Sequence, residues 1–590
     1  MLISHRSMAG LVVAASVASA LAGPAMGAEI PGDPLRFDPT AYTTVHILLD
    51  GVPTEVRHYH VVYVAKPVVV DLTKSAPMGG PGGPPADGAA GAGSAAGGTP
   101  SARNPMAMMP VATDPLGYES MEIYVPQSSY NNQTTAIVLQ VGNGGWRASP
   151  SNDRIKEGDK FSGTSDTDNT GAALKAGYVI VNAGTRSRGI RSASGEWVGK
   201  APAVVVDAKA AIRYLRYNDA LMPGSAERIV ITGGSGGGGL SVAIAASGNS
   251  RDYYPYLAAI GAAGIDTHGH STIRDDVFAT VAYCPINDLG HSDIAYEWQF
   301  HGVRTAANTM GGKYPEDMQA ASATLAAEYP AFIAGLHLKR EDGSAFGADN
   351  LRAGILALVA KGVEAALARG VKVPALGEDF HISLPRGPFG SGAPITIRNE
   401  WLTVENGHVK HIDYENYLKF VASITPLKTV PAFDASANTG NKGESGENTL
   451  FGSANESYSN FTEYAWNHNE VKGDGSGPDD TGMQWSAWIK GPGAELARQI
   501  KMVSPIPYLN SPQATVAPYW YVRHGNLDRD TSFALQTTLY YAIKNDARVK
   551  DVNFLFAWLQ PHGGDYDVQE AYRWVADVLQ HAGAPKTAAE

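Results

Sequence analysis

The sequence predicts an α/β fold, in which a mostly parallel sheet flanked by helices is interrupted by a long, mostly helical insertion. Three observations lead to this prediction. Apolar strand patterns alternate with helix patterns over residues 135–286, a rhythm that is typical of a parallel sheet. The rhythm stops over residues 287–504 and returns over residues 505–590. Strand patterns without helices between them come first, which indicates an antiparallel start to the same sheet.

Hydrophobic periodicity and turn residues set the bounds of the expected elements. Strands are expected at residues 44–49, 61–70, 121–125, 135–141, 178–183, 228–232, 277–284, 520–523 and 553–559. Helices are expected at residues 203–217, 320–329, 353–369, 531–545 and 568–579, and another begins near Ser235. The insertion is expected to lie over the strand ends as a lid domain, because such segments supply substrate walls and exclude water.

The N-terminus has the features of an export signal. His5 and Arg6 precede an apolar stretch from Met8 to about Ala22, and small residues follow. The stretch is shorter than the roughly 20 apolar residues that a membrane span requires. We therefore expect residues 1–28 to be removed as a signal peptide, which leaves a periplasmic or extracellular protein without a membrane anchor.

Composition narrows the class of protein further. The formal net charge is −12 and the chain has no block of Lys or Arg, whereas a nucleic-acid surface needs clustered positive charge. Nucleic acid is therefore not an expected partner. The single cysteine, Cys284, lies in an apolar strand pattern and is interpreted as a small core residue. Residues 76–110 are largely Gly, Pro, Ala and Met, so a disordered insertion is expected there.

The chemistry is expected at a glycine-rich turn between a strand and a helix. The strand at residues 228–232 runs into GGSGG at residues 233–237, which matches G-x-S-x-G in the strand-turn-helix context of a nucleophile elbow. Glycines let the strand and the helix approach closely and leave the serine exposed at the helix N-terminus. Ser235 is the predicted nucleophile, and the backbone amide of Gly236 is a predicted donor to the oxyanion.

The same glycine run also fits a dinucleotide-binding pattern. Gly234, Gly236 and Gly239 satisfy G-x-G-x-x-G, and Asp252 follows at about the distance expected for a ribose contact. Asp252 comes after a turn sequence, however, and not at the end of a second strand. A nucleophile elbow therefore explains the run better than a dinucleotide site.

A serine nucleophile needs a base to accept its proton and an acid to orient that base. The sequence supplies both in the order Ser, Asp, His that is typical of α/β-hydrolases. Asp528 follows the predicted strand at residues 520–523, and His562 lies in a turn after the last strand. We therefore predict an α/β-hydrolase sheet with a catalytic triad of Ser235, Asp528 and His562. His524 is expected to pack or to form a hydrogen bond near the strand end.

A second oxyanion donor is expected in the loop after the strand at residues 135–141. This loop reads GNGGW, and glycine lets a backbone N–H approach the substrate oxygen closely. Gly145 is the predicted donor, and Gly144 is the alternative. Neither H-E-x-x-H nor a Cys-rich ligand spacing occurs, so neither a metal ion nor an organic cofactor is expected.

Several separate blocks of the sequence carry a family resemblance. They extend from about Gly117 to the last helix and read AGTRSRG, KAPAVVVDAKAAIRYLRYN, GGSGGGGLS, AYCPINDLGHSDIAYEWQF, LKTVPAFD, ENTLFG, RHGNLDRDTS and PHGGDYD. Together these blocks resemble bacterial tannases, α/β-hydrolases that act on galloyl esters. Gly236 stands where the family more usually has Ala, a difference that is expected to leave the elbow intact.

The resemblance implies a serine esterase that releases gallic acid from a small galloyl ester through an acyl-enzyme. It also implies that Lys428, Glu447 and Asp530 hold the three gallate hydroxyls, by their positions in LKTVPAFD, ENTLFG and RHGNLDRDTS. The loop between Lys428 and Glu447 is longer than usual in the family, so Glu444 is a rival for Glu447. Two alternatives stay open: a feruloyl or other aryl carboxylesterase of the same fold, and a non-catalytic dinucleotide- or carbohydrate-binding protein.

Overall fold

A ten-stranded sheet organises the chain, with the strand order β14-β13-β8-β7-β4-β6-β3-β2-β1-β5. The computed structural model describes residues 32–75, 112–384, 392–439 and 443–583. The predicted signal peptide (1–28) and the predicted disordered insertion (76–110) lie outside these described residues. From Leu35 on, the described residues form one compact unit.

The strands and helices agree with most of the predicted elements. The strands of the large sheet are β1 (Thr43–Leu49), β2 (Val52–Val62), β3 (Ser120–Pro126), β4 (Ile137–Gln140), β5 (Lys160–Phe161), β6 (Val179–Ala183), β7 (Ile229–Gly234), β8 (Ala279–Tyr283), β13 (Tyr519–Gly525) and β14 (Asp551–Ala557). The helices are α1 (Asn169–Lys175), α2 (Ala203–Tyr217), α3 (Gly236–Ala246), α4 (Tyr254–Ala259), α5 (Leu289–Phe300), α6 (Glu316–Gly335), α7 (Ala348–Ala368), α8 (Tyr414–Ile424), α9 (Glu463–Asn467), α10 (Gly477–Thr481), α11 (Trp485–Trp488), α12 (Ala494–Met502), α13 (Phe533–Asn545) and α14 (Val568–His581).

The sheet is mixed, as the sequence predicts. From β6 through β4, β7, β8 and β13 to β14, each strand pairs in parallel with the next. β1, β2 and β3 join antiparallel beside β6. The predicted α/β class, with an antiparallel start to a mostly parallel sheet, is therefore confirmed.

One predicted strand is wrong. Residues 61–70 were expected to form a strand, but β2 begins at Val52 and ends at Val62. The apolar residues that follow, such as Tyr63 and Val70, are buried in the core without strand pairing. Pro67 lies in this stretch and has no backbone N–H for a ladder, so its apolar residues do not continue the strand, although several of them are buried.

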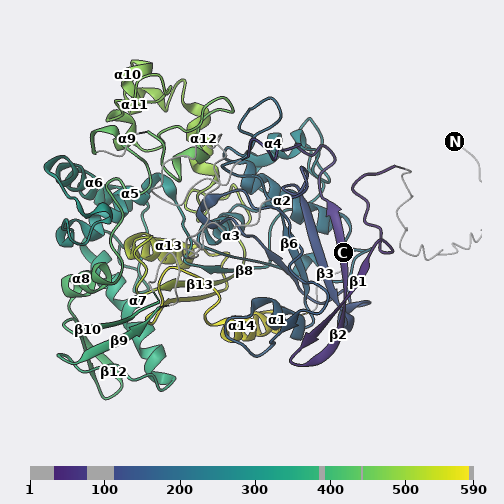
Figure 1. Ribbon diagram of the computed structural model, residues 1–590, viewed down its shortest axis with the longest axis horizontal. Coiled ribbons are helices and arrows are strands. Elements are labelled where there is room, and N and C mark those ends of the chain that lie inside the picture. The colour runs from purple at the N-terminus through teal and green to yellow at the C-terminus, as the bar shows by residue number, and fades with distance from the viewer. Residues whose placement is uncertain (1–31, 76–111, 385–391, 440–442, 584–590) are drawn as a thin grey trace, which may run out of the picture. The chain divides into compact units, whose positions relative to one another are not determined.

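Helices cover both faces of the sheet (Figure 1): α2 and α3 lie on one face, and α1 and α14 lie on the other. Successive strand residues point to opposite faces. Along β4, Val138 belongs to the apolar cluster under α1 and α14, whereas Leu139 belongs to the cluster with α2 and α3. Burial on both faces explains why the central strands are apolar throughout.

The chain between β8 and β13, which includes the predicted lid at residues 287–504, contains α5 to α12 together with two hairpins. These hairpins are β9 (Asp379–Ser383) with β10 (Pro394–Arg398), and β11 (Leu402–Glu405) with β12 (His408–Ile412). The insertion is not separate from the sheet, because α7 packs against β14 and both α5 and α7 pack against α13. Across the described residues, no helix is both long enough and apolar enough to span a membrane.

Candidate active site

Four strand ends meet at one edge of the sheet and carry the residues that the sequence singles out. Because β4, β7, β13 and β14 run in the same direction, their carboxyl ends lie together, which is where open α/β sheets form their sites. Gly145 follows β4, Ser235 follows β7, Asp528 follows β13 and His562 follows β14. The fold thus brings together side chains that are 327 positions apart, Ser235 and His562.

The turn at Ser235 has the geometry of a nucleophile elbow. Ser235 has φ 59° and ψ −123°, a conformation that non-glycine residues rarely adopt and that persists only where the surroundings enforce it. The neighbouring glycines leave no room for a side chain, since a Cβ on Gly233 would lie 2.5 Å from the Gly237 carbonyl oxygen. A Cβ on Gly237 would lie 2.7 Å from the Val141 carbonyl oxygen. The close approach of strand and helix therefore requires both glycines.

Ser235, His562 and Asp528 form a continuous hydrogen-bonded chain. His562 Nε2 lies 2.8 Å from Ser235 Oγ, and His562 Nδ1 lies 2.8 Å from Asp528 Oδ2. The other carboxylate oxygen, Asp528 Oδ1, accepts a hydrogen bond of 2.7 Å from the backbone N–H of Asp530. Asp528 is completely buried and His562 is nearly so. This arrangement holds the imidazole between an acid and a hydroxyl, as general-base catalysis requires.

The pKa values of Asp528 and His562 shift in opposite directions. Burial alone would raise the pKa of Asp528, but the charges of His562 and His524 and the hydrogen bond from His562 hold it below its usual value. Burial alone would lower the pKa of His562, but the charge of Asp528 and its hydrogen bond raise it above its usual value. Asp528 is therefore ionised, and it favours the imidazolium that forms when Ser235 gives up its proton.

His524 and Cys284 pack behind the triad. The His524 ring meets Phe533 and Phe556 at centroid distances of 5.4 Å, and burial lowers its pKa to about 4. A neutral, packed His524 agrees with the role expected from the sequence. Cys284 is completely buried, and burial raises the pKa of its thiol well above the usual value. Its location therefore fits a core residue and not a nucleophile.

The loop that carries Gly145 packs closely against Gly236. The position of a Cβ on Gly236 lies 3.0 Å from Gly145 N and only 2.2 Å from the Asn143 carbonyl oxygen, so glycine is required there. Gly145 has φ +59°, which suits glycine. The alternative donor, Gly144, already donates its N–H to the Gly142 carbonyl oxygen at 2.6 Å. The geometry therefore favours Gly145 over Gly144.

Lys428 and Asp530 face the same histidine. The charge of Asp530 raises the pKa of His562, and the charge of Lys428 lowers it. The Lys428 ammonium lies 3.7 Å from the centroid of the Phe433 ring. Asp530 Oδ1 accepts a hydrogen bond of 2.5 Å from the Arg529 guanidinium, while Oδ2 is buried without a hydrogen-bond partner among the described residues. A buried carboxylate oxygen without a donor is costly, so Oδ2 is poised to accept a hydroxyl of a bound molecule.

Glu447 approaches the site from the inserted segment. It is 6% exposed and directly precedes the short helix η9 (Asn448–Leu450). Burial lowers the pKa of Arg188 to about 10, and the charge of Glu447 opposes this shift more strongly than the charge of Glu444 does. Glu447 is therefore the stronger electrostatic partner of Arg188.

Arg188 is a site residue that sequence reasoning missed. It is buried, and its Nε donates to the Gly145 carbonyl oxygen at 2.7 Å. One of its terminal nitrogens donates to Thr449 Oγ1 at 3.4 Å. Arg188 thus joins the loop of Gly145 to the loop of Glu447. A signal was present, because the arginine follows a strand whose carboxyl end lies at the site edge.

The contacts of Asp252 do not support a dinucleotide site at the glycine run. Its carboxylate pairs with the Lys501 ammonium at 2.7 Å and accepts a hydrogen bond of 2.9 Å from the Tyr508 hydroxyl. These partners anchor the chain before α4 to the end of α12. Asp252 therefore has a structural role, and the glycines serve the elbow at Ser235.

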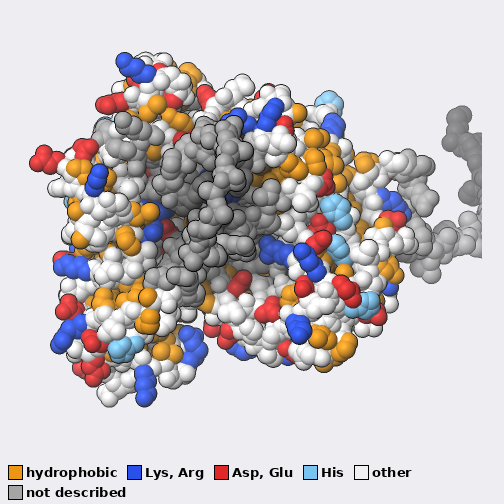
Figure 2. Space-filling model, viewed as in Figure 1, with side chains coloured by type: hydrophobic (Ala, Val, Ile, Leu, Met, Phe, Trp, Pro, Cys, Tyr) orange, Lys and Arg blue, Asp and Glu red, His pale blue; other side chains and the backbone are white. Residues whose placement is uncertain are grey.

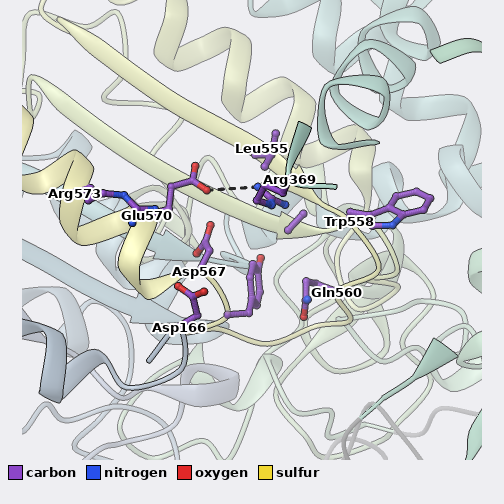
Figure 3. A pocket seen from close by; sticks show the side chains of 10 residues that line it. Asp166, Arg369, Leu555, Trp558, Gln560, Asp567, Glu570 and Arg573 are labelled. Atoms are coloured by element: carbon purple, nitrogen blue, oxygen red, sulfur yellow. Dashed lines mark ion pairs between the residues drawn. The ribbon is translucent and has the colours of Figure 1, made fainter. Parts of the chain in front are cut away.

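A cavity of about 140 Å³ lies beside the end of β14 (Figure 3). Trp558 and Gln560 line it from the turn after the strand, and Glu570 lines it from α14. Glu570 pairs with Arg369 at 3.7 Å and with the buried Arg523 at 2.7 Å. None of the predicted site residues is among those that line the cavity. The ion pair between Glu570 and Arg523 joins α14 to β13 of the sheet.

Comparisons with known proteins identify a family model and solved structures that this chain resembles. A family model named BD-FAE matches residues 121–330. The native structure of a tannin acyl hydrolase from Lactobacillus plantarum is 27% identical, with a TM-score of 0.67 over 92% of this chain and 99% of that chain. A tannase from Fusobacterium nucleatum is also 27% identical, with a TM-score of 0.66 over 92% of this chain and 99% of that chain.

Similar structures include complexes with 3,4-dihydroxybenzoate and with ethyl gallate. The complex with ethyl gallate is that of a tannin acyl hydrolase, 27% identical, with a TM-score of 0.67 over 92% of this chain and 99% of that chain. A search of curated protein sequences returned no match. Because the similarity covers almost the full length of both chains, it includes the inserted segment as well as the sheet. The chain is therefore an α/β-hydrolase that resembles the bacterial tannases over 92% of its length.

Proposed function

We propose that the protein is a serine esterase that hydrolyses galloyl esters and releases gallic acid. The observation that carries this proposal is the chain of two 2.8 Å contacts from Ser235 Oγ through His562 to Asp528. The similarity to tannases, one of which was solved in complex with ethyl gallate, also supports the proposal. The features around residues 1–28 support export to the periplasm or the medium.

The proposed reaction has two steps. His562 Nε2 takes the proton of Ser235 Oγ as the oxygen bonds to the ester carbonyl carbon, and the amides of Gly236 and Gly145 donate to the oxyanion. His562 then gives this proton to the alcohol as the ester C–O bond breaks. In the second step, water loses a proton to His562 and attacks the acyl-enzyme. Gallic acid leaves, and Ser235 regains its proton.

Recognition of the acid part is proposed for Lys428, Glu447 and Asp530. The galloyl ring carries three hydroxyl donors, and ionised carboxylates can only accept hydrogen bonds. The unpartnered oxygen of Asp530 fits one of them. The Lys428 ammonium stabilises phenolate character. Lys428 and Glu447 both come from residues 287–504, so we propose that this segment supplies one wall of the substrate site.

Substrate preference tests the galloyl assignment. We expect the wild-type protein to hydrolyse methyl gallate faster than methyl ferulate or methyl benzoate. In Asp530→Asn, kcat/KM for methyl gallate is expected to fall by about 10- to 100-fold, because a hydroxyl loses an ionised acceptor. The rate on methyl benzoate, which has no hydroxyl to bind, is expected to change little. Lys428→Ala and Glu447→Gln are also expected to lower kcat/KM for methyl gallate and to change the rate on methyl benzoate little.

Glu444→Gln is the matched control for Glu447→Gln, because both carboxylates lie in one loop and only Glu447 is assigned to substrate. It is expected to keep the gallate preference. Equal wild-type rates on the three esters would refute the galloyl assignment and favour a general aryl esterase. Loss of preference in Glu444→Gln alone would reassign the contact to Glu444.

The pH dependence tests the proposed base. His562 must be neutral to accept the serine proton, and its pKa lies above the ordinary value of about 6.5. Activity is therefore expected to fall as the pH drops, with the acid limb of kcat/KM above pH 6.5. Rates measured with methyl gallate at pH values from about 5 to 9 would check this expectation. An acid limb clearly below 6.5 would contradict a base coupled to Asp528.

A further inference from the structure

A second cluster of titratable side chains lies on the antiparallel part of the sheet, away from the proposed catalytic site. His58 and His60 are two residues apart on β2 and therefore share one face. The strand register places Glu122 of β3 opposite His60, and Asp153 joins from the loop after β4. β2 is four strands from β7 in the sheet, which corresponds to about 19 Å.

The two carboxylate oxygens of Glu122 contact different partners. Glu122 Oε1 accepts from His60 Nδ1 at 2.8 Å and from Ser151 Oγ at 3.0 Å. Glu122 Oε2 lies 2.8 Å from His58 Nε2, and His58 Nε2 lies 3.6 Å from Asp153 Oδ1. One imidazole nitrogen and two carboxylate oxygens therefore converge, with all three atoms within 4.8 Å of one another.

This spacing fits a small tetrahedral ion. Two ligand atoms that each lie about 2.0–2.1 Å from a tetrahedral zinc ion are about 3.3–3.4 Å apart. The observed distances of 2.8 Å and 3.6 Å lie on either side of that value. Imidazole nitrogen is a ligand for zinc-like transition metals, whereas Mg²⁺ and Ca²⁺ prefer oxygen ligands only. The donor set therefore selects a transition metal.

The surroundings of the cluster also fit a metal site. Ligating carboxylates in metal sites are themselves held by hydrogen bonds, and His60 and Ser151 hold Glu122 in this way. The Glu122 side chain is 6% exposed, whereas that of Asp153 is 61% exposed, so an ion can enter beside Asp153. Figure 2 shows histidine side chains beside acidic ones on the surface near β1, β2 and β3.

We propose that His58 Nε2, Glu122 Oε2 and Asp153 Oδ1 bind one divalent transition-metal ion of the zinc type, with His60 and Ser151 orienting Glu122. Water completes the coordination. The ion links the β2–β3 pair to the loop that also carries Gly145, so it stabilises the fold around that loop. Two other clusters of possible ligands among the described residues contain Asp528 and belong to the proposed catalytic site.

Calorimetric titration of the metal-free, tag-free full chain with Zn²⁺ tests the proposal. We expect one site per chain, with the affinity lowered at least about 10-fold in His58→Gln and Asp153→Asn. Asp153 is exposed, so Asp153→Asn is expected to fold normally. His60→Gln is expected to weaken binding about 10-fold through Glu122, with the same stoichiometry. Thermal melting should show that Zn²⁺ raises the Tm of the wild type more than that of these variants.

His46→Gln is the matched control. His46 of β1 pairs with Glu157 at 3.2 Å, and both side chains are exposed. No third ligand group accompanies this pair among the described residues. The variant is therefore expected to bind Zn²⁺ as the wild type does. Absence of saturable binding by the wild type would overturn the proposal. Wild-type affinity in both His58→Gln and Asp153→Asn would overturn it equally.

Discussion

Replacement of Ser235 by Ala is expected to lower kcat by about 10⁴- to 10⁶-fold, the range seen when a serine nucleophile is removed from an enzyme of this type. The reason is that Ser235 Oγ, the proposed nucleophile, is the atom that forms a hydrogen bond with His562 Nε2. The same variant is expected to lose covalent labelling by a fluorophosphonate probe. Hydrolysis of methyl gallate and gel detection of the label would measure both effects.

Ser241→Ala is the matched control for this variant. Ser241 lies in the same helix, α3, and donates its hydroxyl to the Gly237 carbonyl oxygen at 2.8 Å. Its loss is expected to cost about 1 kcal/mol of folding stability, with labelling retained. Labelling of Ser235→Ala at the wild-type rate would show that another residue is the nucleophile, and it would remove the basis of the esterase assignment.

Much of this site could be predicted because each residue stands in a local pattern with a physical cause. The glycines around Ser235 are needed where β7 and α3 nearly touch, and such a need is visible in sequence as a glycine run between a strand and a helix. Asp528 and His562 each follow a strand pattern. Since parallel strands end at one edge, their meeting could be inferred without any contact being known.

The features that were missed depend on contacts between distant segments. β2 contains Glu55, Arg57 and two histidines, so it lacks the apolar character of the central strands. The strand was therefore predicted at the apolar residues 61–70 that follow. Arg188 resembles any surface arginine until the fold encloses it between two loops. The His58 and Glu122 cluster depends on the register between β2 and β3, which no local pattern specifies.

Replacement of Asp528 by Asn is expected to lower kcat by about 10⁴-fold, with the nucleophile still in place. Asp528 Oδ1 accepts the backbone N–H of Asp530, so the amide oxygen of the new side chain is held there. The amide nitrogen then faces His562 Nδ1 and donates to it. This moves the ring proton to Nε2, which can no longer accept the proton of Ser235. Steady-state rates on methyl gallate and the rate of fluorophosphonate labelling would both be measured.

Asp530→Asn distinguishes the two acids that stand two residues apart. The backbone N–H of Asp530 that holds Asp528 survives this change, and the contact between Asp528 and His562 is retained. Labelling by the small probe is therefore expected to stay within a few-fold of wild type, while kcat/KM for methyl gallate falls. If Asp530→Asn instead lost labelling and Asp528→Asn kept it, Asp530 would be the acid that orients His562. The proposed contact of Asp530 with a gallate hydroxyl would then have to be abandoned, because Oδ1 already accepts from Arg529 and Oδ2 would be the oxygen that His562 engages.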